Sequence, residues 1–128
     1  ALLNAGEIDA VCMGIGENGH IAFNDPPVAD FADPLDVKVV RLDDVCRMQQ
    51  VHDGCFASMA DVPQYALTLT VPRLLRANCH FCVVPGAMKA EAVTHMLRDE
   101  ISVRCPASAL RTCENAVLYL DADSGAGG

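Results

Sequence analysis

A mostly apolar run at residues 8–13 leads directly into the glycine-rich stretch Gly14-Ile15-Gly16, and this junction is the feature that most constrains the fold. Apolar residues that end at such a turn are typical of a buried strand followed by a loop. In α/β sheets, ligands bind beyond the carboxyl ends of the strands. The polar residues that follow therefore predict a candidate site built from Asn18, His20, Asn24 and Asp25.

His20 is the residue in this loop best suited to acid–base chemistry, because the unperturbed pKa of an imidazole lies near neutrality. The Asp25 carboxylate could orient the imidazole and stabilise its charged form, and the prolines at 26 and 27 stiffen the chain after it. The alternative is a glycine-rich turn in which the histidine caps a helix and the Asn and Asp side chains bond to nearby backbone. The loop also matches Gly-x-Gly-x-x-Gly formally, but the two prolines leave little room for the helix of a dinucleotide site.

Strand and helix patterns alternate along the chain. We expect strands at residues 8–14, 37–42, 66–70, 79–84 and 116–120, and helices at 43–50, 72–76, 87–97 and 107–110. This alternation favours an α/β fold, with a Rossmann-like parallel sheet and helices on both faces.

The composition narrows the classes of partner and site. Of 128 residues, 52% are hydrophobic and 20% are charged, which is typical of a globular chain. A net charge of −8 argues against nucleic acid, and no apolar run is long enough to cross a membrane. The seven cysteines are odd in number and scattered. Cys79 and Cys82 would point to opposite faces of a strand, so we expect reduced, structural cysteines in a cytoplasmic protein and no metal site.

The stretch Gly16-Glu17-Asn18-Gly19-His20-Ile21-Ala22-Phe23-Asn24-Asp25-Pro26 resembles the signature loop of the glucosamine-6-phosphate deaminase/isomerase family. Three later segments resemble family segments in the same order: Val62-Pro63-Gln64-Tyr65-Ala66-Leu67-Thr68, Gly86-Ala87-Met88-Lys89-Ala90 and Pro106-Ala107-Ser108-Ala109-Leu110. The related 6-phosphogluconolactonases share the fold and the Gly-His pair, but the residues after His20 are more similar to the deaminases.

The resemblance implies a role for each matching residue. His20 would open the pyranose ring of an amino-sugar phosphate, assisted by Asn18 and Asp25. Lys89 would bind the substrate phosphate, and Gly19 would also contact the substrate. The reaction implied is conversion of glucosamine 6-phosphate to fructose 6-phosphate and ammonia, a hydrolase/isomerase activity without an organic cofactor. A lactonase, another sugar-phosphate enzyme or a non-catalytic sugar-phosphate-binding protein are the alternatives.

Two positions depart from the family pattern. Asp25 stands where the family usually has Glu, which shortens the reach of the carboxylate by about 1.5 Å. The family's phosphate-binding Arg before Val62-Pro63 has no clear counterpart, and counting back places Asp53 or a neighbour there. Either Arg47 or Arg41 replaces that Arg from another direction, or the substrate is modified.

The resemblance covers nearly the whole chain but only the second half of the family's pattern. We therefore expect residues 1–121 to be the C-terminal portion of a larger single domain and residues 122–128 to be a flexible tail. The first half of the family's pattern supplies a second phosphate-binding turn and the Asp that moves the proton between carbon atoms. The 128 residues alone are thus expected to be inactive, and a homo-oligomer is possible.

Overall fold

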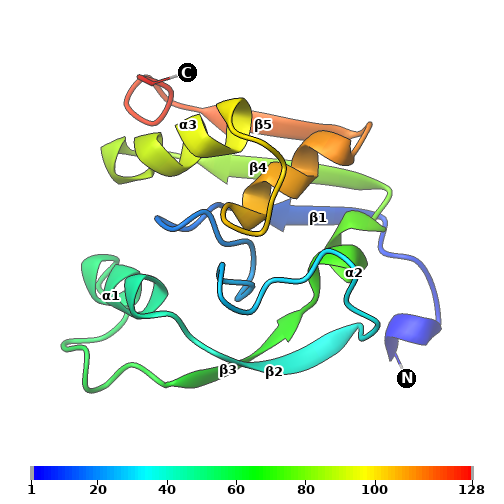
Figure 1. Cartoon of the computed structure of the whole chain (residues 1–128), viewed down its shortest axis with the longest axis horizontal. Coiled ribbons are helices and arrows are strands. Elements are labelled where there is room, and N and C mark those ends of the chain that lie inside the picture. The colour runs from blue at the N-terminus through cyan, green and yellow to red at the C-terminus, as the bar shows by residue number, and fades with distance from the viewer. Residues whose placement is uncertain (1, 128) are drawn as a thin grey trace.

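Three strands form a parallel sheet with β4 at its centre (Figure 1). They are β1 (Ala10–Met13), β4 (Cys79–Val84) and β5 (Ala116–Leu120), and both edge strands pair in parallel with β4. The structure is a computed structural model that describes residues 2–127. The β-branched and apolar residues of these strands suit a pleated sheet with a buried face, and the predicted α/β class with a parallel sheet is confirmed.

Helices pack on one face of this sheet and bury its inward-pointing side chains. They are α2 (Val71–Leu75), α3 (Ala90–Arg98) and the 3₁₀ helix η3 (Pro106–Thr112), and Figure 1 shows α3 lying in front of β4 and β5. Cys82 and Val84 of β4 join the same core cluster as Val93 of α3 and Leu110 of η3. No helix among residues 2–127 is long and apolar enough to span a bilayer.

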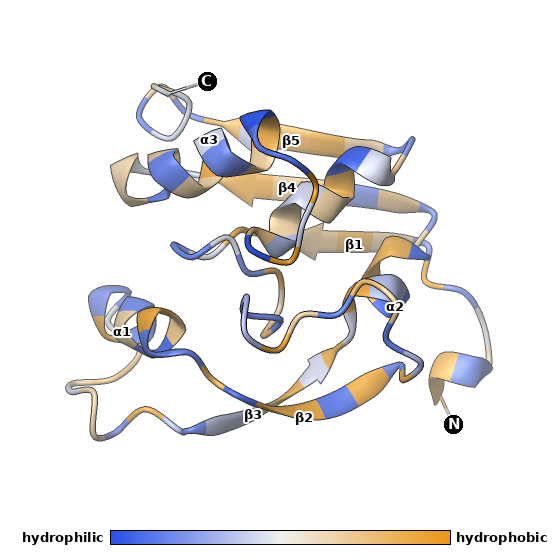
Figure 2. Ribbon diagram, viewed as in Figure 1, coloured by the Kyte–Doolittle hydropathy of each residue, from blue (hydrophilic) through white to orange (hydrophobic). Residues whose placement is uncertain are grey.

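The opposite face of the sheet is apolar and exposed. Phe81, Val83, Val117 and Tyr119 retain 38%, 55%, 45% and 49% of their accessible surface, and Figure 2 shows that most residues of β4 and β5 are hydrophobic. Successive strand residues alternate between faces, so these four side chains lie on the side away from the core. Residues 2–127 supply helices to one face only, and the second helical layer that the sequence predicts is not formed by them.

A separate two-stranded antiparallel sheet contains β2 (Val37–Arg41) and β3 (Tyr65–Leu69). Strand and helix alternation predicts these strands but not their antiparallel pairing. The helix α1 (Asp44–His52) starts three residues after β2, and the chain then returns beside β2 instead of joining the main sheet. Thr68 fixes β3 to the loop after β1, because its hydroxyl accepts a hydrogen bond from the Phe23 N–H.

The last residues form hydrogen-bonded turns beside the end of β4. The Asp121 carboxylate accepts hydrogen bonds from the N–H groups of Ser124 and Gly86, and Ser124 is fully buried. These contacts fix the beginning of the segment that the sequence predicts to be a tail. The mobility of residues 122–127 stays a prediction, and residue 128 lies outside the described residues.

Candidate active site

The loop at residues 14–25 leaves β1 at the carboxyl edge of the parallel sheet, between that sheet and α1 (Figure 1). A tight turn begins it: the Gly16 N–H donates to His20 O, and the Gly19 N–H donates to Gly16 O, each at 2.9 Å. Gly19 has φ +80, a conformation that favours glycine. The Ala107 N–H of η3 also donates to Gly19 O at 2.9 Å, which anchors the turn to the core.

Gly16 lies directly against the imidazole of His20. A Cβ placed on Gly16 would come within 2.0 Å of the His20 Cε1 atom. Only glycine leaves room for the ring at this position, because real Cβ contacts of this length do not occur. Gly16 therefore provides the space that the histidine ring occupies.

The hydrogen bonds of Asn18 determine which nitrogen of His20 carries the proton. Asn18 Oδ1 lies 2.6 Å from His20 Nδ1 and also accepts the His20 backbone N–H at 3.1 Å. Because a carbonyl oxygen can only accept, Nδ1 must be the donor. The neutral imidazole therefore keeps its lone pair on Nε2, where it can act as a base.

The amide nitrogen of Asn18 links two carboxylates. Nδ2 donates to Asp25 Oδ1 and to Asp43 Oδ2, both at 3.2 Å. Carboxylates only accept, so this assigns the amide nitrogen to their side and the amide oxygen to His20. Asn18 thus fixes the His20 and Asp25 side chains relative to each other, and its own side chain is uncharged.

Asp25 reaches His20 despite being one methylene shorter than the family's Glu. Its Oδ1 lies 3.1 Å from His20 Nδ1, and its Oδ2 accepts the Asp43 N–H at 2.8 Å. The side chain is fully buried. Burial alone would raise the pKa of this carboxyl, but hydrogen bonds from His20, the Asp43 N–H and Asn18 together hold its pKa below the usual value. A charged Asp25 can therefore stabilise a protonated His20.

Asn24 is a structural residue of the loop. Its Nδ2 donates to Ile21 O at 2.9 Å and to Leu69 O at 2.8 Å, and the side chain is fully buried. It fixes the loop to β3 and faces away from solvent. Of the four loop residues predicted for the site, the structure brings together the side chains of Asn18, His20 and Asp25.

The start of α1 supplies two further groups that sequence reasoning did not identify. Asp43 contributes both its N–H and its carboxylate, as described above, and Cys46 lies in the first turn, 2% exposed. Burial, the charge of Asp25 and a hydrogen bond to Asp25 raise the pKa of the Cys46 thiol to about 12. The adjacent acidic residues at 43 and 44 indicate a helix start, but nothing in the spacing indicates contact with the loop.

Lys89 stands at the junction between the 3₁₀ helix η2 (Ala87–Lys89) and α3, close to the predicted first helical turn. Its side chain is half-buried. Burial lowers the pKa of the ammonium, and the negative groups of Asp53 and Glu17 partly oppose this. Lys89 therefore lies on the same side of the molecule as the loop and the end of α1, among acidic neighbours.

Neither arginine considered in place of the family's phosphate-binding Arg lies at this site. Arg47 donates to the backbone carbonyls of Met59 and Val62 at 2.9 and 3.0 Å and so fixes the segment after α1. Arg41 is exposed on β2, on the same face as Val39. At the end of α1 it is instead His52 that approaches the loop, with its Nδ1 3.3 Å from Glu17 Oε1.

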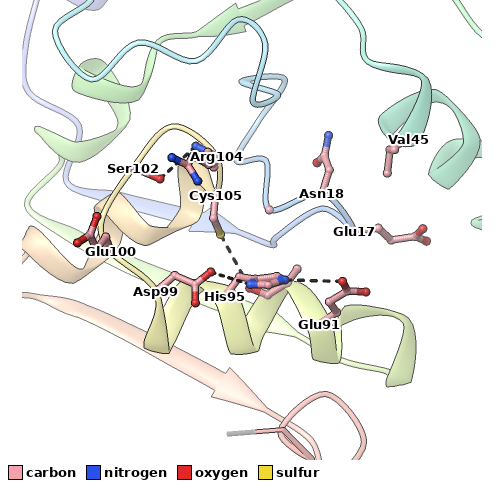
Figure 3. Close-up of a pocket in the computed structure, with 12 residues that line it drawn as sticks. Glu17, Asn18, Val45, Glu91, His95, Asp99, Glu100, Ser102, Arg104 and Cys105 are labelled. Carbon is pink, nitrogen blue, oxygen red and sulfur yellow. Dashed lines mark hydrogen bonds and ion pairs between the residues drawn. The ribbon is translucent and has the colours of Figure 1, made fainter.

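A cavity of about 620 Å³ opens beside the loop, between the loop, α1 and α3 (Figure 3). Asn18 and Gly19 line it, whereas His20 and Lys89 do not. Figure 3 shows His95 of α3 between Glu91 and Asp99, with distances of 3.6 and 2.7 Å. The cavity therefore touches the residue that orients His20 but is not the space in front of Nε2.

Comparison with known proteins identifies the family. Residues 2–119 match the family described as glucosamine-6-phosphate isomerases/6-phosphogluconolactonase. The chain belongs to this family. The resemblance found in the signature loop is thereby confirmed.

Curated relatives are named glucosamine-6-phosphate deaminase. One from Alkaliphilus metalliredigens is 33% identical over 120 residues, covering 94% of this chain and 48% of the relative. One from Bacillus cereus (strain G9842) is 36% identical over 123 residues, covering 96% and 45%. The chain thus spans about half the length of these relatives.

Solved structures agree with the family membership. A monomeric glucosamine-6-phosphate deaminase superposes with a TM-score of 0.91 at 32% identity, covering 99% of this chain and 51% of that protein. A 6-phosphogluconolactonase from Trypanosoma cruzi superposes with a TM-score of 0.66 at 21% identity, covering 94% and 41%. The second likeness concerns the fold alone.

Proposed function

We propose that this chain carries the ring-opening and phosphate-binding groups of an amino-sugar-phosphate deaminase, which converts glucosamine 6-phosphate to fructose 6-phosphate and ammonia. The observation that carries this proposal is the arrangement of Asn18, His20 and Asp25, in which Nδ1 of the imidazole is held as a donor and Nε2 is left as a base. The names of the curated relatives support the same reaction.

His20 would act in the first step. Its Nε2 takes the proton of the anomeric hydroxyl, the bond between the anomeric carbon and the ring oxygen breaks, and the ring oxygen receives a proton. The imidazole becomes positively charged during the transfer, and the buried Asp25 carboxylate 3.1 Å away stabilises that charge. Asn18 keeps the ring in the required tautomer. The later steps are not assigned to residues of this chain.

Lys89 would hold the phosphate. A half-buried ammonium at the start of a helix suits an anion, since the helix dipole favours negative charge there. Glu17 and Asp53 act on Lys89 through their negative charge, so these side chains must turn away for the phosphate to bind beside Lys89 without repulsion. Gly19 lets the substrate approach the backbone of the loop.

The direct test measures ammonia release from glucosamine 6-phosphate by the full-length protein. We expect His20→Ala to reduce kcat by at least about 100-fold, as for loss of a positioned general base. His95→Ala is the matched control, because this exposed histidine lies on α3 and pairs with Glu91 and Asp99 instead of with Asn18 or Asp25. Robust ammonia release by His20→Ala would remove His20 from the mechanism.

A substrate panel separates the proposed reaction from its rivals. Hydrolysis of 6-phosphogluconolactone without ammonia release from the amino sugar would identify a lactonase. Binding of glucosamine 6-phosphate in calorimetry with no turnover would identify a sugar-phosphate-binding protein. Asp25 in place of Glu and the acidic surroundings of Lys89 are the features that make this panel necessary.

A further inference from the structure

Three side chains with metal-binding chemistry meet where the loop contacts α1. A nitrogen of His20, a carboxylate oxygen of Asp25 and the sulfur of Cys46 all lie within 4.8 Å of one another. Asp25 and Cys46 are 0% and 2% exposed, while the His20 side chain is 12% exposed. The proposed ring opening uses His20 and Asp25 but gives no role to the Cys46 thiol.

We propose that His20, Asp25 and Cys46 form a binding site for a thiophilic divalent cation, with Zn²⁺ the best match, and that the bound ion inhibits the enzyme by occupying the imidazole. Imidazole nitrogen, carboxylate oxygen and thiolate sulfur are the ligands that Zn²⁺ takes in proteins. Thiolate softness disfavours Mg²⁺ and Ca²⁺ at the same place. The inhibition rests on the proposed function, whereas the binding does not.

The spacing of the three atoms suits an ion of this size. Any three points no more than 4.8 Å apart share a position within about 2.8 Å of each, and Zn²⁺ bonds to N, O and S are about 2.0–2.3 Å long. Shifts of about 0.5–0.8 Å per side chain therefore close the site. Water would complete the fourth position, entering past the partly exposed imidazole.

Groups around the cluster already orient the ligands and provide negative charge. The Asp43 N–H holds Asp25 Oδ2 at 2.8 Å, and the Asp43 carboxylate lies close enough to accept from Asn18 Nδ2 at 3.2 Å. Such hydrogen bonds to ligating carboxylates strengthen metal sites in general. The two carboxylates offset the charge of a divalent cation.

Binding requires the thiol proton to leave. Without metal the thiol is protonated, since burial and Asp25 raise its pKa to about 12. Formation of the sulfur–zinc bond releases this proton to solvent. The imidazole nitrogen beside Asp25 is Nδ1, so its bond to zinc also moves the Nδ1 proton to Nε2, and in total one proton leaves for each ion bound with no oxidant or reductant needed.

The test of binding uses Co²⁺ as a spectroscopic substitute for Zn²⁺ in the full-length protein. We expect a thiolate-to-metal charge-transfer band that disappears in Cys46→Ala and that Zn²⁺ removes by competition. Zn²⁺ affinity by calorimetry should fall at least tenfold in Cys46→Ala, with Cys46→Ser as a second variant if the first folds poorly. Cys82→Ala is the control, since Cys82 is equally buried but lies in β4.

The outcomes distinguish the site from the proposed function. Absence of the charge-transfer band, or its persistence in Cys46→Ala, overturns the site even if the protein releases ammonia. Zn²⁺ binding through Cys46 in a protein that releases no ammonia keeps the site and rejects the deaminase. If the protein both binds Zn²⁺ through Cys46 and releases ammonia, micromolar Zn²⁺ should inhibit the unmodified enzyme. The Cys46→Ala enzyme should need at least a tenfold higher Zn²⁺ concentration for the same inhibition. Equal inhibition of the two enzymes would contradict inhibition through this site.

Discussion

Asn18 Oδ1 lies 2.6 Å from His20 Nδ1, closer than the Asp25 carboxylate oxygen at 3.1 Å. The nearest partner of the imidazole is thus a neutral amide, and the carboxylate is the second. An amide fixes the tautomer without raising the basicity of the ring as strongly as a charged partner does. An Asp at this position would combine both effects in one residue, whereas this chain divides them between Asn18 and Asp25.

Replacing Asn18 with Asp should destabilise the protein. The change removes two N–H donors and places a third carboxylate beside Asp25 and Asp43. We expect the free energy of unfolding at pH 7 to fall by about 1–3 kcal/mol, as for buried acceptors that lose their donors, and the loss to shrink as acid protonates the carboxylates. Urea unfolding at several pH values measures it. The exposed control Asn115→Asp should change little, and an equal effect of both substitutions would contradict this account.

Gly16→Ala should impair turnover without unfolding the protein. The new Cβ would meet the imidazole at 2.0 Å, so His20 must move. Misplacing a catalytic group by about 1 Å costs on the order of 100-fold in rate. Gly14→Ala is the matched control, because its Cβ would meet only Val83 O at 3.4 Å. Ammonia release by the full-length variants checks this, and a Gly16→Ala enzyme as fast as Gly14→Ala would show that the close packing is unimportant.

The local pattern of the sequence predicts the parallel strands and the loop that carries Asn18, His20 and Asp25. This works because apolar alternation, glycine turns and proline stops act over a few residues. The roles drawn from the family resemblance fall on residues that the structure brings together in the same loop, and the place of Lys89 at the start of α3 follows from a strand–turn–helix pattern.

Contacts between segments that are distant in the sequence could not be predicted from its local pattern. Nothing in residues 43–46 indicates that Asp43 and Cys46 meet Asp25, because that contact depends on how α1 folds back against the loop. The antiparallel pairing of β2 with β3 depends in the same way on the connection between them. The exposed face of β4 and β5 shows a further limit, since an apolar strand pattern indicates that a face can be covered but not by which residues.

Ala22→Gly should stabilise the protein. Ala22 has φ 50, the left-handed conformation that costs a non-glycine residue about 1–2 kcal/mol. Glycine removes this strain but adds freedom to the unfolded chain worth about 0.4–1 kcal/mol, so we expect a net gain of about 0.5 kcal/mol. Ala32→Gly, an exposed loop position without positive φ, should instead destabilise. Thermal or urea unfolding of both variants measures the change in stability. A lower free energy of unfolding for both variants would show that Ala22 is not strained.

His95 should add a small stabilisation that disappears as the pH rises. A hydrogen bond to Asp99, 2.7 Å from Nδ1, raises the pKa of this imidazole, and Glu91 adds to the effect. A group whose pKa is raised by folding contributes fully below its unfolded pKa of about 6.5 and loses its contribution as the pH passes the raised value. The pair is half-exposed, so a few tenths of a kcal/mol are expected.

Asp99→Asn tests the histidine pair. NMR titration should show a lower pKa for His95 in the variant, and the stability difference from the parent should be present at pH 5.5 and absent well above the raised pKa. The other charged side chains that line the same cavity, Glu17, Glu100 and Arg104, are unchanged in this comparison. An unchanged His95 pKa in Asp99→Asn would contradict the assignment to Asp99 and leave Glu91 as the group that raises it.

Lys89→Met should weaken substrate binding with a smaller effect on the chemical step. Methionine keeps most of the apolar stem but removes the charge that the phosphate would contact. Loss of one charge-assisted contact is worth about 1.4 kcal/mol or more, which is a tenfold rise in KM, whereas kcat depends on His20, which lies on a different element. Arg98→Met removes a charge from the far end of α3, where the side chain is exposed, and is the matched control.

Glucosamine without phosphate provides the second comparison, because any slow turnover of it should be insensitive to Lys89. A Lys89→Met enzyme with normal KM for the phosphorylated sugar, or with equal losses for both sugars, would show that the phosphate binds elsewhere.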